Sequence, residues 1–195
     1  MVKRILHKIT GKFFSLWKLH ILIFAATFIF FNTCSYPQIQ KEIEHKLKAA
    51  YLFHFLQFAE WPDSVFENEK SPIILAVLGK DPFGKILDET VMSEKIGDHP
   101  IIIKRFQSFN QLDFCHVLYI CSSEKYTFRN ILKHIGESPV LTISDIDGFS
   151  EQGGNISFYL EENKVRFAIN MQTLKQADLK VSSKLLRLAK IINPI

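Results

Sequence analysis

The chain lacks the residue groupings on which most hydrolases and metal sites depend. Its 195 residues include three cysteines and seven histidines, but they contain no Cys-x-x-Cys, no His-x-x-x-His and no Gly-x-Ser-x-Gly. These absences argue against a zinc site of ordinary ligand spacing and against an α/β-hydrolase elbow. We expect no catalytic residue, no metal ligand and no cofactor, so the chain is interpreted as a binding protein and not an enzyme. A metal site assembled from residues far apart in the sequence stays open.

Two segments come close to catalytic motifs but miss an essential residue. Gly79–Lys85 resembles a phosphate-binding P-loop, but Ile86 stands where the metal-binding hydroxyl is required. Ser122-Ser-Glu-Lys125 fits Ser-x-x-Lys, but no Ser-Asp-Asn or Lys-Thr-Gly partner occurs. We interpret the first as a strand-to-helix turn and the second as a helix cap.

A charge excess is also missing from most of the chain. The formal net charge is +4, from 24 Lys and Arg against 20 Asp and Glu. Five of the basic residues lie in the first 35 residues, which carry no acidic one. The remainder therefore has 19 basic against 20 acidic side chains, and a nearly neutral domain has no electrostatic footprint for nucleic acid.

The leader has the pattern of an export signal. A basic stretch precedes an apolar run over residues 21–31, which is shorter than the roughly 18 residues of a membrane span. We predict a signal peptide over residues 1–35, with cleavage near Ser35, and a mature domain over residues 36–195 in the periplasm. A lipidated Cys34 and an uncleaved N-terminal anchor are the two alternatives.

After cleavage, Cys115 and Cys121 are the remaining cysteines. Six positions along a predicted strand separate them by roughly 20 Å, which is too far for a disulfide. We expect two buried thiols that pack as small hydrophobes; a bridge between two chains is the alternative.

The order of periodic segments predicts the fold. Strands alternate with helices up to about residue 135, and two alternating segments follow, with Ile156, Phe158 and Leu160 on one face of the first. We predict a single three-layer α/β domain with a mixed, mostly parallel sheet flanked by helices. It ends in an antiparallel hairpin and a last helix. The predicted helices cover 41–61, 81–91, 122–135, 171–177 and 183–192; the predicted strands cover 73–78, 101–106, 115–121, 141–143, 156–160, 165–169 and 179–181.

The first helix is predicted to pack through a broad apolar face. Its leading row is Ile43, Leu47, Tyr51, Phe55 and Phe58, and a second row of Leu52, Leu56 and Ala59 widens it. Lys48 is expected to face outward. The apolar second half of the helix is assigned to the core, with pairing to another subunit as the alternative.

The segment from Val140 to Asn170 holds the candidate site. Asp145, Asp147 and Glu151 flank Gly148-Phe149 at the end of a strand, where carboxylates serve acid–base work or a cation, or simply form turns. Phe149 is either an exposed contact for a partner or a buried anchor of its loop. The candidate partner- or ligand-binding residues are Asp145, Phe149, Tyr159 and Arg166.

Several stretches together resemble the YfiR family. They are residues 49–62, which end in Trp61-Pro62, and residues 78–84, 115–120, 141–154, 166–170 and 179–189. The resemblance covers nearly the whole mature chain, in order. It implies a periplasmic regulator that binds the sensor region of an inner-membrane diguanylate cyclase and inhibits it, limiting cyclic-di-GMP and biofilm formation. It also implies an outer-membrane lipoprotein that sequesters the regulator, and a homodimer. An exported small-ligand binding module for another membrane sensor is the alternative.

The cysteines depart from the family pattern. Relatives carry cysteines that pair, and the resemblance places one of them at Ala76, so that Cys115 has no such partner here. Ser150 and Ser157 fill the positions where a second pair occurs. Redox tuning of stability is therefore not expected in this member.

Overall fold

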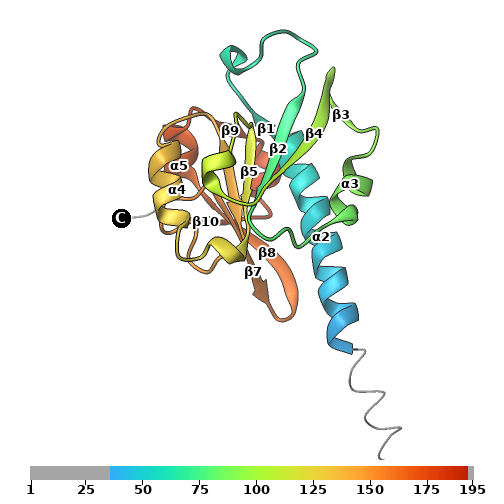
Figure 1. Ribbon diagram of the computed structural model, residues 1–195. Helices are drawn as coiled ribbons and strands as arrows, with labels where there is room; N and C mark the ends of the chain where they lie inside the picture. Colours follow the sequence, from blue (N-terminus) through green and yellow to red (C-terminus); the bar gives the residue numbers. More distant parts are fainter. Residues whose placement is uncertain (1–35, 193–195) are drawn as a thin grey trace, which may run out of the picture. The chain divides into compact units, whose positions relative to one another are not determined.

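An eight-stranded sheet forms the centre of the fold, with the strand order β10-β8-β7-β6-β5-β2-β4-β3 (Figure 1). The computed structural model describes residues 36–192, so the predicted signal peptide, its cleavage site and the alternatives at Cys34 lie outside the described residues. Residues Glu44–Ile195 form one compact unit, and the sheet belongs to it. The described part of the preceding unit, Met1–Ile43, is the beginning of helix α2.

The pairing of the strands is mixed and mostly parallel. β2 (Ile73–Leu78) lies between β4 (His99–Phe106) and β5 (Val117–Ile120), parallel to both. β6 (Leu141–Ser144) and β7 (Ile156–Glu161) continue the parallel order. β8 (Lys164–Asn170) turns back antiparallel to β7, and the short β3 (Lys95–Ile96) is antiparallel to β4. The predicted mixed sheet and C-terminal hairpin are confirmed.

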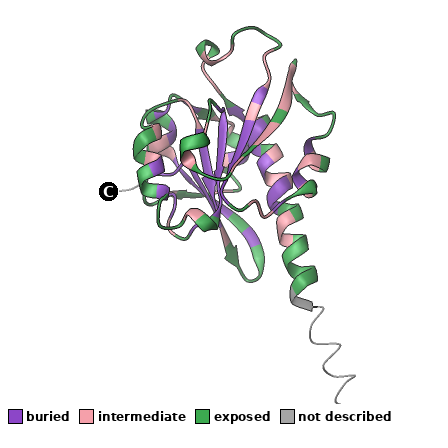
Figure 2. Cartoon of the chain, viewed as in Figure 1, coloured by how far each residue is buried: buried purple, intermediate pink, exposed green. Residues whose placement is uncertain are grey.

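Two hydrophobic clusters cover the two faces of the sheet, which gives the three predicted layers. Alternate residues of β5 point to opposite sides: Val117 and Tyr119 join one cluster, Leu118 and Ile120 the other. The first cluster contains side chains from α2 (Tyr36–Phe58), α3 (Lys85–Val91), α5 (Met171–Gln176) and α6 (Ser183–Leu186), and the second from α4 (Phe128–Ile135). Figure 2 shows the buried residues concentrated along the central strands.

The helix predicted over 41–61 runs instead over Tyr36–Phe58. Ala59–Glu60 forms β1, which pairs antiparallel with β9 (Lys180–Val181), and Ser182 N–H donates to the carbonyl of Phe58 at 2.9 Å. The helix ends before Pro62 because these backbone groups pair with another strand.

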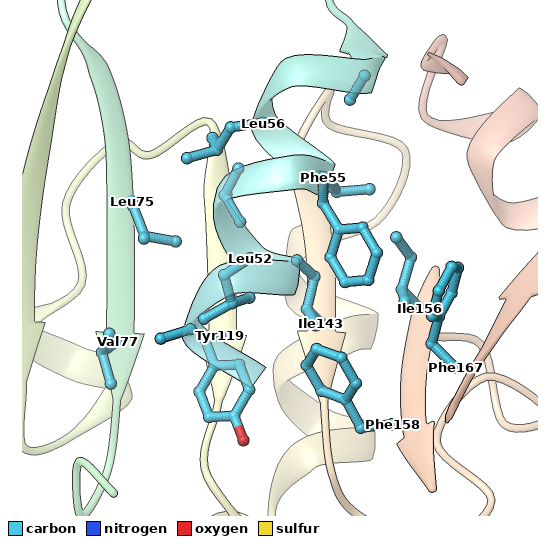
Figure 3. Close-up of a cluster of buried hydrophobic side chains, with 14 of the residues drawn as sticks. Leu52, Phe55, Leu56, Leu75, Val77, Tyr119, Ile143, Ile156, Phe158 and Phe167 are labelled. Atoms are coloured by element: carbon cyan, nitrogen blue, oxygen red, sulfur yellow. The ribbon is translucent and has the colours of Figure 1, made fainter. Parts of the chain in front are cut away.

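The core face of α2 combines parts of the two predicted rows. Leu47 of the leading row is 40% exposed, but Phe55 of the same row is fully buried, as are Leu52 and Leu56 of the second row. Figure 3 shows Phe55 beside Phe158 and Phe167. The expected outward Lys48 is also buried. Both predicted rows therefore contribute to the contact in the second half of the helix, and the buried face includes one charged residue.

The predicted last helix over 183–192 is wrong beyond its first turn. Ser182 does cap a helix, since its hydroxyl accepts from Lys184 N–H, but α6 ends at Leu186 and Lys190–Ile192 forms β10, parallel to β8. Leu188, which the predicted helix would place on its inward apolar face, is 69% exposed. β8 would otherwise be an edge strand with unpaired backbone groups, and β10 satisfies them.

Two other helices begin later than predicted. α3 begins at Lys85, because Asp81 Oδ1 accepts from Phe83 N–H at 2.7 Å and holds the preceding residues in a turn. The helix predicted from Ser122 begins as a 3-10 turn over Ser122–Glu124, and α4 follows from Phe128. Tyr126, which the predicted helix would place on its apolar face, is 86% exposed.

Within residues 36–192, no helix combines the length and the hydropathy needed to cross a membrane.

Candidate functional site

The loop between β6 and β7 carries the acidic residues singled out in the sequence. Ser144 closes β6: its hydroxyl donates to the carbonyl of Ile120 at 2.7 Å and accepts from Ile146 N–H at 3.0 Å. These two bonds tie the end of β6 to the end of β5 and turn the chain sharply at Asp145. The loop therefore leaves the sheet at the carboxyl ends of two neighbouring parallel strands, where ligands of open α/β sheets commonly bind.

A cavity of about 540 Å³ opens at this edge of the sheet. One wall comes from the segment that leads into α4 and from its first turn, with Lys125, Tyr126 and Arg129; the other comes from the loop, with Asp145 and Asp147. Its size lies within the range of small-molecule sites. The walls carry both charge signs, which suits a polar ligand.

Asp145 lines this cavity and also forms a contact with α2. Its Oδ2 accepts from Lys48 Nζ at 2.9 Å, and Glu44 binds the same ammonium at 2.6 Å. Burial opposes the charge of Lys48, but the two carboxylates outweigh it and raise the pKa of Lys48. Asp145 therefore joins the loop to α2 through a partly buried ion pair.

Two polar atoms beside this ion pair have no hydrogen-bond partner among the described residues. They are Asp145 Oδ1 and the hydroxyl of Tyr119, both buried. Burial first, and then the negative charge of Asp145, raise the pKa of Tyr119 well above its usual value, so the phenol stays protonated. The phenol is thus a neutral donor next to a carboxylate.

Phe149 is the anchor of its loop, the second of the two roles considered for it. The ring is fully buried and packs against Phe128 of α4 with ring centroids 5.6 Å apart. Gly154 lies so close that a Cβ there would be 2.0 Å from the Phe149 ring, which explains the glycine at this position. Phe149 acts on any partner only through the shape of the loop.

Buried polar side chains fasten the rest of the loop to the hairpin. Ser150 Oγ and Ser157 Oγ lie 2.7 Å apart in a hydrogen bond. Asn170 Nδ2 donates to the carbonyl of Ser150 at 2.7 Å, and Asn155 Oδ1 accepts from both the amide and the hydroxyl of Thr142. The two positions at which the resemblance implies a second cysteine pair are thus in direct contact, joined here by a hydrogen bond.

Tyr159 and Arg166 lie opposite each other on the hairpin, in the register of β7 and β8. Tyr159 is half-buried, and the Lys190 ammonium lies over its ring, 5.9 Å from the ring centre. Arg166 is exposed and pairs with Glu161 at 3.4 Å. The neighbouring Leu160, predicted to be buried with Ile156 and Phe158, is instead 56% exposed, since the hairpin extends beyond the layer that covers its base. The four candidate residues therefore lie in two places: Asp145 and Phe149 in the loop, Tyr159 and Arg166 on the hairpin.

A group of rings around His116 was missed by the sequence analysis. Phe66 stacks between His99 and His116, with ring centroids 4.4 and 4.9 Å away. His116 Nδ1 accepts from Ile74 N–H at 3.0 Å, and its Nε2 is buried without a partner among residues 36–192. Burial first, and then the nearby His99, lower the pKa of His116 to about 4. The available signal was a lone histidine in the apolar run 115–121.

Cys115 and Cys121 are free and buried, as the sequence predicts, and belong to the clusters on opposite faces of the sheet. Burial raises the pKa of both thiols to about 12, so both stay protonated and unreactive. Across the described part of the chain, no three His, Cys, Asp or Glu side chains gather as a metal site would require.

A family described as YfiR/HmsC-like matches residues 45–190. This range includes the sheet up to the first residue of β10, α2 from its third turn onward and both places that hold the candidate residues. No curated protein matches the chain.

Proposed function

Because the chain belongs to the YfiR/HmsC-like family, we propose that it is a non-enzymatic periplasmic regulator. It binds the periplasmic sensor region of an inner-membrane diguanylate cyclase and holds the enzyme inactive, which limits cyclic-di-GMP and biofilm formation. The family match over residues 45–190 is the observation that carries this proposal. An outer-membrane lipoprotein that sequesters the regulator, and a homodimer as its active form, belong to the same proposal.

The buried groups support a role in binding. The thiols and the Tyr119 phenol have raised pKa values and stay protonated, and His116, with its pKa lowered to about 4, stays neutral above that pH. A nucleophile or general base for neutral pH needs the opposite tuning. Regulation would instead work by a population shift, in which binding favours the inactive arrangement of the cyclase.

We place the contact with the cyclase on the projecting hairpin. Tyr159, Leu160 and Arg166 give it an aromatic ring, an exposed apolar side chain and a guanidinium within a few residues. Tyrosine and arginine are the residue types that most often dominate binding energy at interfaces. The hairpin turn is tight, with Glu162 and Asn163 both at positive φ, so it presents these groups on a rigid support.

A second candidate function rests on the cavity beside Asp145. Its size and mixed charge suit a small polar ligand, and the chain would then report that ligand to a membrane sensor. The ion pair between Asp145 and Lys48 would carry the signal from the cavity to α2.

Affinity capture from detergent-solubilised membranes distinguishes these functions. The mature chain is immobilised, and captured proteins are identified by mass spectrometry. The regulator proposal predicts a membrane protein with a diguanylate cyclase domain, and weaker capture by Arg166→Ala. Lys133→Ala, at an exposed position on α4 away from the hairpin, is the control and should leave capture unchanged. A saturable thermal shift with polar metabolites, and no captured sensor, would favour the ligand-binding module and contradict the regulator.

A further inference from the structure

A second cavity, of about 520 Å³, lies at the opposite end of the central strands from Asp145. It is bounded by the connector before β5, which includes the 3-10 turn η2 (Phe109–Gln111), and by the end of α4 with the turn that leads to β6. Cys115 and Val140, which precede β5 and β6, line it as well. It shares no lining residue with the first cavity, so the two are separate sites.

The walls of this cavity are aromatic and aliphatic. Phe109 meets His134 edge to face, with ring centroids 5.1 Å apart, and Phe114 contributes a ring that is 50% exposed. Leu112 and Ile135 complete the apolar surface. Such walls favour a flat aromatic molecule, which can stack on one ring and meet another at its edge.

The lining has no uncompensated charge. Asp113 is its one carboxylate, and that group accepts from Phe114 N–H at 2.8 Å and pairs with Lys104 at 3.3 Å. These contacts lower the pKa of Asp113 and leave its side chain 72% exposed, so it faces water more than the cavity. Cys115 is a protonated thiol. A charged ligand would lose its hydration here without gaining an opposite charge.

Three polar side chains stand at the cavity without a hydrogen bond to any other described residue. They are the Asn110 amide, the His134 imidazole and the Ser138 hydroxyl. Apolar walls with a few uncommitted polar groups are the usual composition of a small-molecule site, because the walls supply affinity and the polar groups fix orientation.

We propose that this cavity binds a small, uncharged aromatic molecule that carries a hydroxyl or a carbonyl group. The proposal is independent of the function proposed above. It is a ligand site distinct from the hairpin and from the cavity beside Asp145.

Isothermal titration calorimetry of the mature chain tests it, with 2-naphthol as the uncharged probe and 2-naphthoate as its charged counterpart. We expect saturable binding of 2-naphthol with a Kd below about 1 mM, and binding of 2-naphthoate at least about tenfold weaker. Ser138→Trp fills the cavity and should abolish binding. Ser122→Trp makes the same change in the first cavity and should leave binding unchanged.

Circular dichroism melting shows whether both tryptophan variants fold; if Ser138→Trp does not, Asn110→Trp from the opposite wall replaces it. Three results would overturn the proposal: no saturable binding of 2-naphthol, equal affinity for the two probes, or binding that persists in the folded cavity-filling variant.

Discussion

A lysine that sequence periodicity places in water lies 5% exposed against the candidate loop. Lys48 holds Asp145 and Glu44 at 2.9 and 2.6 Å. Removing the ammonium would leave Asp145 partly buried with neither of its oxygens paired within the described residues, and such uncompensated burial is costly.

We predict that Lys48→Met lowers the free energy of unfolding by about 3 kcal/mol, measured by urea denaturation at pH 7. Lys104→Met, in the exposed pair with Asp113, is the matched control and should change stability by less than about 1 kcal/mol. Adding Asp145→Leu to Lys48→Met should recover part of the loss. Equal effects of the two lysine changes would contradict the role given to Lys48.

Because of His116, the free energy of unfolding is expected to depend on pH. The unfolded chain takes up a proton below about pH 6.5, whereas the folded chain keeps His116 neutral down to about pH 4. Unfolding therefore becomes more favourable as the pH falls through this window, by at most about 1.4 kcal/mol for each pH unit. Above the window His116 contributes no pH dependence, and below it the loss is complete.

His116→Asn should remove this slope, since asparagine retains an acceptor for Ile74 N–H but does not titrate. Free energies of unfolding between pH 7 and pH 4 provide the measurement. His54→Asn, at an exposed position, is the control. Parallel profiles for the His116 variant and the parent would show that His116 is not the acid-sensitive group.

At the scale of elements, the loop after β6 depends on the close approach of Gly154 to Phe149. Gly154→Ala should destabilise the domain by about 1–3 kcal/mol, because the added methyl overlaps the ring and the loop must shift. Thermal melting of Gly154→Ala, Phe149→Leu and the double variant tests this in a double-mutant cycle. The smaller side chain in the double variant should relieve part of the cost of the alanine; strictly additive effects would mean that the two residues are not in contact.

The same loop is joined to β7 by the serine pair. Ser150→Cys with Ser157→Cys should form a disulfide on air oxidation, since the two Oγ atoms are 2.7 Å apart. Closing so short a loop is expected to stabilise the domain by about 2.5 kcal/mol at most. The difference in melting temperature with and without dithiothreitol measures the effect, and each single variant is its control. A double variant that stays reduced would contradict the observed geometry.

The sequence predicted elements well wherever a periodic pattern agreed with the final packing. The hairpin β7–β8 and the buried β2 and β6 are such cases, because alternation or an unbroken apolar run decided both their type and their place. The prediction failed at Lys190–Ile192. This segment has a helical pattern of apolar residues, but it pairs with the free edge of β8 as a strand. The prediction also placed Ile43 and Leu47 of α2 in the core, where they are exposed, since apolar spacing alone does not show how far along the helix the sheet covers it.

The candidate site was predicted in part for the same reason. Asp145 was found because a carboxylate at the end of a strand is a local signal. Its partner Lys48 lies 97 positions away, and the ring cluster around His116 joins residues from Trp61 to His116. Such contacts depend on the order of strands in the sheet, which no local pattern encodes.

At the scale of the whole molecule, burial moves the pKa values of the two thiols, Tyr119 and His116 away from those of a nucleophile or general base at neutral pH. The proposed function therefore depends on the surfaces of the domain. Its loop, its hairpin and its sheet, apart from the last two residues of β10, lie within the range matched by the YfiR/HmsC-like family. The proposed regulation needs this domain outside the inner membrane, where it meets the sensor region of the cyclase.

The most direct test is the cellular concentration of cyclic-di-GMP, measured by mass spectrometry in a strain that lacks the gene. The account predicts a rise after deletion and a return to the parental level when the full chain is restored. Restoring residues 36–195 without the leader, so that the product stays in the cytosol, should leave the level high. An unchanged level after deletion, or full rescue by the cytosolic form, would contradict the proposed function.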